Sequence, residues 1–306
     1  MVAIQGSIEL VKDSGVVTLS SGGQTAIFGG TTPTTKLNGD IRALWLKLYS
    51  NITISGANAN TNGAMGTLAN LIIKDKDNQQ IKNYLGQDLP YRYWHLTRKV
   101  LTNPSMAGAA AGNVSGTVTM RLPIGLFKER GPFTIEGFFA PWGEIATLIT
   151  AGTGQLQIYQ ENGPASHMTY EDYQALTGLT DTNYDLSNQI PTVPMSHMAM
   201  VAHADSDYTD ITIKKGGLSI YDRTPISILE EIANSYDVTN LQSGVERPSG
   251  YMPLAISPYG YSASDTFRVN FASITSTPDP VSGVSLGSAY NPYRLDYERL
   301  IPRKVA

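Results

Sequence analysis

The chain has 306 residues, of which 41% are hydrophobic and 16% are charged, and its formal net charge is −4. This balance excludes an intrinsically disordered chain and an overall basic field that would attract nucleic acid. The absence of cysteine excludes disulfides, thiolate metal sites and a cysteine nucleophile.

Glycine, proline and tyrosine are frequent (29, 17 and 17 residues), which is typical of many short strands joined by turns. No apolar run approaches the ~20 residues that a membrane-spanning helix needs. Residues 1–15 lack the charged start and apolar core of a secretory signal peptide. We therefore expect a soluble protein that stays in the cytosol until it assembles or acts.

Alternation of apolar and polar residues predicts the first strands. Residues 7–21 alternate on both sides of a turn at 13–15, which indicates a hairpin or two short strands. Residues 40–54 (DIRALWLKLYSNITI) predict a long strand, interrupted in its apolar pattern by Arg42 and Ser50. Its buried face carries Leu44, Leu46, Leu48, Ile52 and Ile54.

A hairpin and a helix are predicted next. The polar segment Asp75–Asn78 lies between two apolar runs and indicates a hairpin turn with an exposed tip. Asp88 is expected to cap the following helix, and Pro90 suits its first turn because it has no N–H to leave unpaired. The expected apolar stripe of this helix is Leu89, Tyr93, Leu96 and Val100.

Further strands are predicted over 116–127, 132–140 and 146–160, the first of them interrupted by Pro123. Thr169 and Asp172 resemble a capping box and Gly178 resembles a helix end, which predicts a short helix over 170–177. A boundary between two lobes is expected between 163 and 194.

The second half repeats the order of the first. Residues 211–236 contain a strand, a Lys/Gly turn, a second strand and a helix that begins at Thr224 and Pro225, as residues 71–101 do. The apolar face of the second helix is Ile226, Leu229, Ala233 and Tyr236. A strand with aromatic ends closes each series, with Phe133, Ile135 and Phe138 in one and Phe267, Val269 and Phe271 in the other. The offset of about 135 residues fits one antiparallel barrel with a helix in a loop, and we interpret it as a duplication.

This layout resembles that of the double jelly-roll major capsid proteins of icosahedral phages, with or without an internal membrane, and of adenovirus-like viruses. The resemblance rests on residues 39–56 (GDIRALWLKLYSNITISG), residues 81–99 (IKNYLGQDLPYRYWHLTRK) and the helix at Pro225. It spans most of Gly39–Ile274 and concerns layout, without a signature motif. It implies an all-β chain with two jelly-roll β-barrels, each with a short helix in a connecting loop. A single barrel with a large insertion is the alternative within the same lineage.

Four parts are expected on this basis. Residues 1–165 form the first jelly-roll barrel with an N-terminal arm, and 166–194 form a linker or insertion with the short helix. Residues 195–280 form the second jelly-roll barrel, and 281–306 form an extended C-terminal arm.

Residues with catalytic or metal-binding chemistry are few, and no catalytic or cofactor-binding residue is predicted. His197 and His203 are evenly spaced, but the H-x-H pair of three-histidine barrel sites is absent. Any two of Glu129, Glu136 and Glu144 could supply a glycosidase pair, although nothing selects them.

One metal candidate is a weak calcium site in the segment DSDYTD. Asp205, Asp207 and Asp210 provide the oxygen ligands that calcium prefers. The segment lacks the glycine and the bidentate glutamate of an EF-hand loop, which favours a solvated turn instead.

The C-terminal segment is rich in tyrosine and arginine, the side chains most used at protein interfaces. We expect it either to fray or to reach a neighbouring subunit or an anionic inner surface. The predicted interface residues are Tyr290, Tyr293, Arg294, Tyr297, Arg299 and Arg303.

The favoured hypothesis is a structural protein without cofactor, a phage major capsid protein that is made in the host cytoplasm and resides in the virion capsid. The resemblance implies a homotrimer that forms pseudo-hexagonal capsomers of an icosahedral shell. Its partners would be copies of itself, penton or minor capsid proteins, and the inner membrane or the genome through the C-terminal arm.

Two other classes of function stay open. One is a carbohydrate-binding or adhesin-like β-sandwich, in which Trp45, Trp94 and Trp142 could stack on sugar rings. Trp45 and Trp94 lie inside predicted regular elements, where burial is expected rather than display. The other is a barrel enzyme of the cupin or glycosidase kind, against which the missing H-x-H pair counts.

Overall fold

The structure is a computed structural model that describes most of the chain. The described residues are 6–28, 35–55, 64–86, 88–97, 101, 111–142, 149–175, 183–185, 187, 195–202, 208–225, 227–229, 251–254, 264–272 and 294–301. The chain divides into two compact units, the first running to Thr169 and the second beginning at Tyr170.

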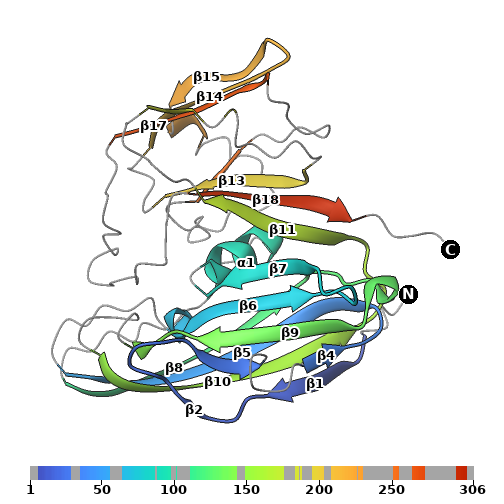
Figure 1. Cartoon of the computed structure of the whole chain (residues 1–306), viewed down its shortest axis with the longest axis vertical. Coiled ribbons are helices and arrows are strands. Elements are labelled where there is room, and N and C mark those ends of the chain that lie inside the picture. Colours follow the sequence, from blue (N-terminus) through green and yellow to red (C-terminus); the bar gives the residue numbers. More distant parts are fainter. Residues whose placement is uncertain are drawn as a thin grey trace. The chain divides into compact units, whose positions relative to one another are not determined.

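The first unit consists mainly of strands. Its elements are β1 (Ile8–Asp13), β2 (Val17–Thr18), β3 (Thr25–Phe28), β4 (Thr35–Leu37), β5 (Ile41–Ile54), η1 (Ala64–Thr67), β6 (Leu68–Lys74), β7 (Gln80–Leu85), α1 (Leu89–Thr97), β8 (Gly112–Leu122), η2 (Lys128–Arg130), β9 (Phe133–Phe139) and β10 (Ile149–Asn162). One antiparallel sheet has the order β1-β10-β5-β8, with β2 beside β10. The other has the order β3-β9-β6-β7, with β4 beside β9, and Figure 1 shows the two sheets as separate layers.

The core of the first unit lies between these two sheets. The predicted face of β5 is confirmed, since Leu44, Leu46 and Leu48 are almost fully buried. Ser50 is buried on the same face, where its hydroxyl lies 2.5 Å from that of Thr67. The opposite sheet contributes buried residues of β9, including Phe139, whose ring packs so closely on Gly154 of β10 that a Cβ there would lie 2.7 Å from the ring. Only glycine therefore fits at this position of β10.

The predicted hairpin at Asp75–Asn78 is confirmed by the antiparallel pairing of β6 and β7. Asp75 organises the turn, because its Oδ1 accepts hydrogen bonds from the N–H groups of Asp77 (3.0 Å) and Gln79 (2.9 Å). Asn78 has a φ of 60°, a left-handed conformation that asparagine tolerates. Asp75 is itself buried, so only part of this turn is exposed.

The helix predicted after Asp88 is confirmed as α1, and the backbone C=O of Asp88 accepts the first hydrogen bond from Arg92 (2.9 Å). The predicted buried stripe is shifted, since Tyr91 and Trp94 are buried whereas Tyr93 and Leu96 are only half-buried. Leu89 is buried as predicted, and the rings of Tyr91 and Trp94 stack with their centres 5.8 Å apart. Val100 lies outside the described residues. None of the helices in the described ranges has both the length and the apolar character to cross a membrane.

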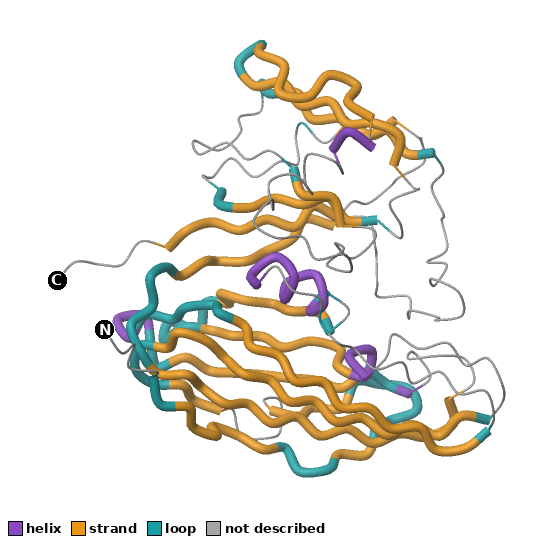
Figure 2. Tube along the Cα trace, turned by 180° about the vertical axis from the view of Figure 1, so that it is seen from behind, coloured by secondary structure: helices purple, strands orange, loops and turns teal. Residues whose placement is uncertain are grey.

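The second unit also folds into two antiparallel sheets (Figure 2). Its strands are β11 (Met168–Ala175), β12 (Asn183–Asp185), β13 (His197–Val201), β14 (Tyr208–Lys215), β15 (Leu218–Pro225), β16 (Tyr251–Pro253), β17 (Thr266–Phe271) and β18 (Arg294–Ile301). The sheet orders are β11-β18-β13-β16 and β12-β17-β14-β15. Both sheets contribute to one core, which includes Met198, Met200, Ile211, Phe267 and Leu295.

The strand orders of the two units are equivalent. In chain order, β1, β3, β5, β6, β7, β8, β9 and β10 of the first unit correspond to β11 through β18 of the second. Helical residues also follow the equivalent strands, with α1 after β7 and residues 227–229 after β15. The predicted duplication and the predicted pair of jelly-roll sandwiches are therefore confirmed, and the alternative of one barrel with an insertion is wrong.

Two predicted helices differ from the structure. Residues 170–177 were expected to be helical, but they fall largely in β11, which pairs with β18. The local capping signal is overridden because this segment supplies the first strand of the second sandwich. Thr224 and Pro225 end strand β15, and the described helical residues are 227–229, of which Leu229 is buried as predicted. Ile226, Ala233 and Tyr236 lie outside the described residues.

The predicted domain limits shift accordingly. The segment 166–194, expected to be a linker, contains β11 and β12, both of which belong to sheets of the second unit. The predicted arm 281–306 contains β18, which lies between β11 and β13 in a sheet. The second sandwich therefore extends on both sides of the predicted range 195–280.

We predict that Leu295→Ala destabilises the second unit by roughly 2–4 kcal/mol, because it removes a fully buried side chain from the core. The matched control is Leu300→Ala in the same strand, whose side chain is 60% exposed, with an expected change within about 0.5 kcal/mol. Denaturant unfolding followed by fluorescence measures both. Equal, small effects would contradict the assignment of β18 to the core.

Candidate assembly interface

The predicted interface residues of the C-terminal segment lie mostly in a strand or outside the described residues. Tyr290, Tyr293 and Arg303 lie outside them, and Arg294 pairs through its backbone with Val201 of β13. The expectation of a free arm is wrong for Arg294–Ile301, because this segment is a sheet strand.

Four side chains of β18, those of residues 296–299, are buried or make contacts within the second unit. Tyr297 packs against the core, and the guanidinium of Arg299 lies 4.1 Å from the ring centre of Tyr170. Asp296 and Glu298 are buried. These residues stabilise their own sandwich and are poor candidates for contacts with a neighbour.

The calcium prediction stays a prediction. Asp205 and Asp207 lie outside the described residues, and Asp210 accepts a hydrogen bond from the side chain of Asn270 (2.8 Å). Within the described ranges, no three histidine or acidic side chains come together as metal ligands would.

The histidines and glutamates considered above as ligands or catalytic residues lie on different elements or outside the described residues. His197 is buried in β13, and His203 lies outside the described residues. Glu136 is bound to Lys74 at 2.8 Å, Glu129 lies in η2, and Glu144 lies outside the described residues. The described positions do not single out a glycosidase pair.

A row of large side chains crosses the outer face of the sheet β1-β10-β5-β8. The register pairs Leu10 with Tyr159, Tyr159 with Trp45, and Trp45 with Arg121. Cross-strand partners lie on the same face of a sheet, and this face is opposite to the one that carries Leu44 and Leu46. Trp45 was expected to be buried as part of a regular element, but it lies half-buried on the outer face, whereas Trp94 is buried as expected.

Glu161 of β10 holds this row in place. Its carboxylate accepts two hydrogen bonds from Arg121 (2.7 Å each) and one from Trp45 Nε1 (3.0 Å), and Arg42 lies 3.8 Å away. The bond from Arg121 is the main reason that the pKa of Glu161 is lowered, and burial opposes it. The same contact raises the pKa of Arg121. Both groups therefore stay charged and paired at neutral pH.

Asp13 fixes the end of β1 against the same sheet. It accepts hydrogen bonds from the side-chain amides of Gln155 (2.8 Å) and Gln157 (2.7 Å) and from the N–H of Gly15 (2.8 Å). These bonds, led by that from Gln155, lower the pKa of Asp13. The edge strand is thus anchored at its end.

Apolar side chains are exposed along this edge. Ile8 and Leu10 of β1 are 55% and 51% exposed, and Val16 in the following turn is 66% exposed. β1 is the edge strand of its sheet, where unpaired backbone groups also face outward. An exposed apolar edge next to a Tyr/Trp/Arg row has the composition of a protein–protein interface. Sequence reasoning missed this surface. The large side chains at odd-numbered positions of β5, such as Trp45 and Tyr49, could have indicated it, because they lie opposite to the buried leucines.

Comparison of the sequence with known protein families and with curated proteins gives no match. Comparison of the fold with solved structures gives matches. The chain is similar to the crystal structure of the STIV MCP (TM-score 0.57, 12% identity, 93% of this chain and 95% of that one). It is also similar to a chain in the atomic structure of Sulfolobus Turreted Icosahedral Virus (TM-score 0.55, 14% identity, 93% and 89%).

A third similar structure is PBCV-1 VP54, fitted into a reconstruction of the virophage Sputnik (TM-score 0.51, 11% identity, 98% and 95%). The likeness extends over nearly the whole length of each chain, which matches the two equivalent sandwiches described above. The chain therefore has the double jelly-roll fold of viral major capsid proteins.

Proposed function

We propose that this chain is a viral major capsid protein, which forms homotrimeric capsomers of an icosahedral shell. The observation that carries the proposal is the presence of two equivalent sandwiches in one chain. Three copies around a three-fold axis bring six similar units together, so that a trimer can fill a position of hexagonal outline. The fold likeness to solved major capsid proteins supports the same function.

The outer face and edge of the first sandwich are proposed to bind a second copy of the chain. Ile8 and Leu10 offer apolar area at the edge, and the adjoining row of Tyr159, Trp45 and Arg121 offers the side chains that dominate binding energy at interfaces. Glu161 holds Trp45 and Arg121 in one arrangement before contact. Less side-chain freedom is then lost on association.

Further partners follow from the same proposal. The protein would be made in the host cytoplasm, would reside in the virion, and would meet neighbouring capsomers and penton or minor capsid proteins. Contact with an inner membrane or the genome through the C-terminal segment would have to use residues outside Arg294–Ile301, because these residues pair with β13. No catalytic role is proposed.

We expect the purified protein to form a trimer with three times the chain mass of 33.1 kDa. Light scattering coupled to size exclusion measures this mass, and electron microscopy of concentrated samples would show hexagonal arrays or shells. A monomer over the whole concentration range, with no assemblies by microscopy, would contradict the proposal.

The double change Ile8→Asp with Leu10→Asp is expected to weaken the trimer by roughly tenfold or more in dissociation constant, since carboxylates are depleted in interface cores. Both positions are exposed in the single chain, so the unfolding temperature should stay near that of the parent. The matched control is Leu218→Asp, whose side chain is 77% exposed in the β14–β15 hairpin. If the mass of the double variant is unchanged, this edge is not the interface.

Glu161→Gln is expected to destabilise the first unit by roughly 1–3 kcal/mol at neutral pH, because Arg121 and Trp45 lose their shared acceptor. The folded pKa of Glu161 lies below its ordinary value of 4.5, so its stabilisation is complete above about pH 5 and is lost as the pH falls through the lowered pKa. The difference in unfolding free energy between parent and variant should therefore shrink on acidification.

Denaturant unfolding at several pH values measures this difference. The control Asp77→Asn removes a carboxylate that is 64% exposed, and its effect should stay within about 0.5 kcal/mol at every pH. A constant difference between parent and Glu161→Gln from neutral to acidic pH would show that the ion pair does not stabilise the sheet.

A further inference from the structure

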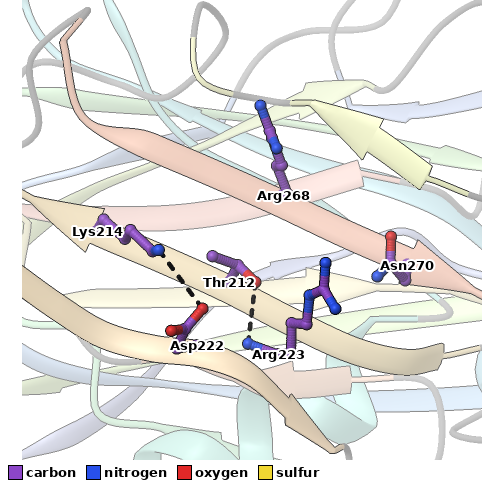
Figure 3. Close-up of a pocket in the computed structure, with 6 residues that line it drawn as sticks. All are labelled: Thr212, Lys214, Asp222, Arg223, Arg268 and Asn270. Atoms are coloured by element: carbon purple, nitrogen blue, oxygen red, sulfur yellow. Dashed lines mark hydrogen bonds and ion pairs between the residues drawn. The ribbon is translucent and has the colours of Figure 1, made fainter.

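The sheet β12-β17-β14-β15 of the second unit carries a polar hollow of about 530 Å³ on its outer face. The hollow is formed on the three neighbouring strands β17, β14 and β15. It is lined by Thr212 and Lys214 of β14, Asp222 and Arg223 of β15, and Arg268 and Asn270 of β17. Figure 3 shows these six side chains on the three strands. Its volume lies in the range of small-molecule sites, and the six described side chains that line it are all polar or charged, which favours a polar ligand.

A β-bulge places Arg223 in this hollow. Ile213 pairs with Tyr221 and Ile211 pairs with Thr224, so that Asp222 and Arg223 together lie opposite Thr212. The φ of Arg223 is 47°, a left-handed conformation that glycine adopts without steric cost. The N–H of Arg223 donates to Thr212 Oγ1 (3.0 Å), which holds the bulge. A strained backbone that carries an arginine where glycine would fit is a feature of functional sites.

Positive charge exceeds negative charge in the lining. Lys214 lies 3.5 Å from Asp222, with both side chains well exposed, and Arg268 is bound to Asp185 outside the hollow at 3.2 Å. Arg223 forms no ion pair with any other described residue. Arginine guanidinium groups bind carboxylate, sulfate and phosphate through two parallel hydrogen bonds, so the hollow is suited to an oxyanion.

Acceptor groups lie among these cations. The Oδ1 of Asn270 accepts no hydrogen bond within the described structure, and because it is covered by neighbouring atoms a ligand would reach it only after a side chain shifts. The carboxylate of Asp222 is a second acceptor. A simple oxyanion would contact only the cationic side chains. A ligand that carries both hydroxyl groups and an oxyanion would also donate hydrogen bonds to the acceptor groups.

The first sandwich provides an internal comparison. When Phe133 and Ile135 of β9 are aligned with Phe267 and Val269 of β17, as in the sequence repeat, the strand pairings align Lys74 with Thr212 and Glu136 with Asn270. In the first sandwich Lys74 and Glu136 neutralise each other at 2.8 Å.

In the second sandwich both members of this pair are replaced by neutral residues. The same alignment places Arg268 at the position of Thr134. Cations therefore gather on this sheet face in one copy of the duplicated sandwich, so their gathering is not a property of the jelly roll itself.

We propose that this hollow binds an anionic saccharide, a sugar that carries a sulfate or carboxylate group. Arg223 binds the oxyanion together with Lys214 and Arg268, and Asn270 and Asp222 accept hydrogen bonds from the sugar hydroxyls. None of the lining residues belongs to the face of the first unit that is proposed to bind a second copy, so the two surfaces can be changed by separate substitutions.

Calorimetric titration of the full chain tests the proposal with a heparin-derived sulfated disaccharide and with sialyllactose, which separate the two sources of the anion. At least one of them is expected to bind, more weakly as salt is raised. Neutral lactose and inorganic sulfate should each bind about tenfold more weakly or worse. Binding of neither charged sugar at millimolar concentration, or equal binding of lactose or inorganic sulfate, would overturn the proposal.

Arg223→Gly separates binding from folding. Glycine suits the left-handed backbone, so the unfolding temperature should equal or exceed that of the parent, while affinity falls about tenfold or more. Lys214→Ala, at an exposed position, should also weaken binding. Lys76→Gly, which removes one cation from the hairpin turn after β6, should leave affinity within about twofold. Unchanged affinity in Arg223→Gly would overturn the assignment of the site.

Discussion

The rest of the structure depends on the pairing of the last strand of each sandwich. This strand inserts between the first strand and the central strand of its sheet. β10 pairs with both β1 and β5, and β18 occupies the equivalent place between β11 and β13. Gln155 of β10 meets Asp13 across 142 positions of sequence, so the sheet closes only when distant segments come together. Each sandwich therefore needs both ends of its own half of the chain. This explains why the C-terminal segment, despite its charged composition, is part of a core.

Period-two alternation predicted the strands in which one face is buried and the other is polar, with β5 as the clearest case. It was missed in β18, where Leu295, Asp296, Tyr297 and Glu298 do alternate, because the pattern covers only four residues and is broken at Arg299 and Leu300. The repeat offset of about 135 residues could have predicted this strand, since it relates residues of β10 to the segment that contains β18. In β11, Thr169 and Asp172 offered a local capping signal, but long-range pairing with β18 decides the conformation. The duplicated topology was thus predictable, while the limits of the second sandwich required the pairing itself.

The candidate surfaces were less accessible to sequence reasoning than the fold. Aromatic residues in a strand were expected to be buried, but Trp45 differs in parity from Leu44 and Leu46 and therefore faces outward. Its half-burial comes from neighbours on two other strands, β10 and β8, which no local pattern in β5 contains. The hollow of the second unit depends on a bulge in the β14–β15 hairpin and on β17, which lies about 40 residues further along the chain. The Lys/Gly turn predicted the hairpin, but neither the left-handed backbone of Arg223 nor its position across β14 from Arg268 could follow from it.

Duplication frees the two copies of a sandwich to diverge on their outer faces while their cores stay under the same constraint. At equivalent positions of β9 and β17, the core residues Ile135 and Val269 remain β-branched and apolar. The neighbouring outward residues differ, since Glu136 balances Lys74 in one copy whereas Asn270 lines a hollow with Lys214, Arg223 and Arg268 in the other. Self-association and recognition of an anionic ligand can be assigned to different copies, because a change on the outer face of one strand alters no contact in the core that the same strand buries.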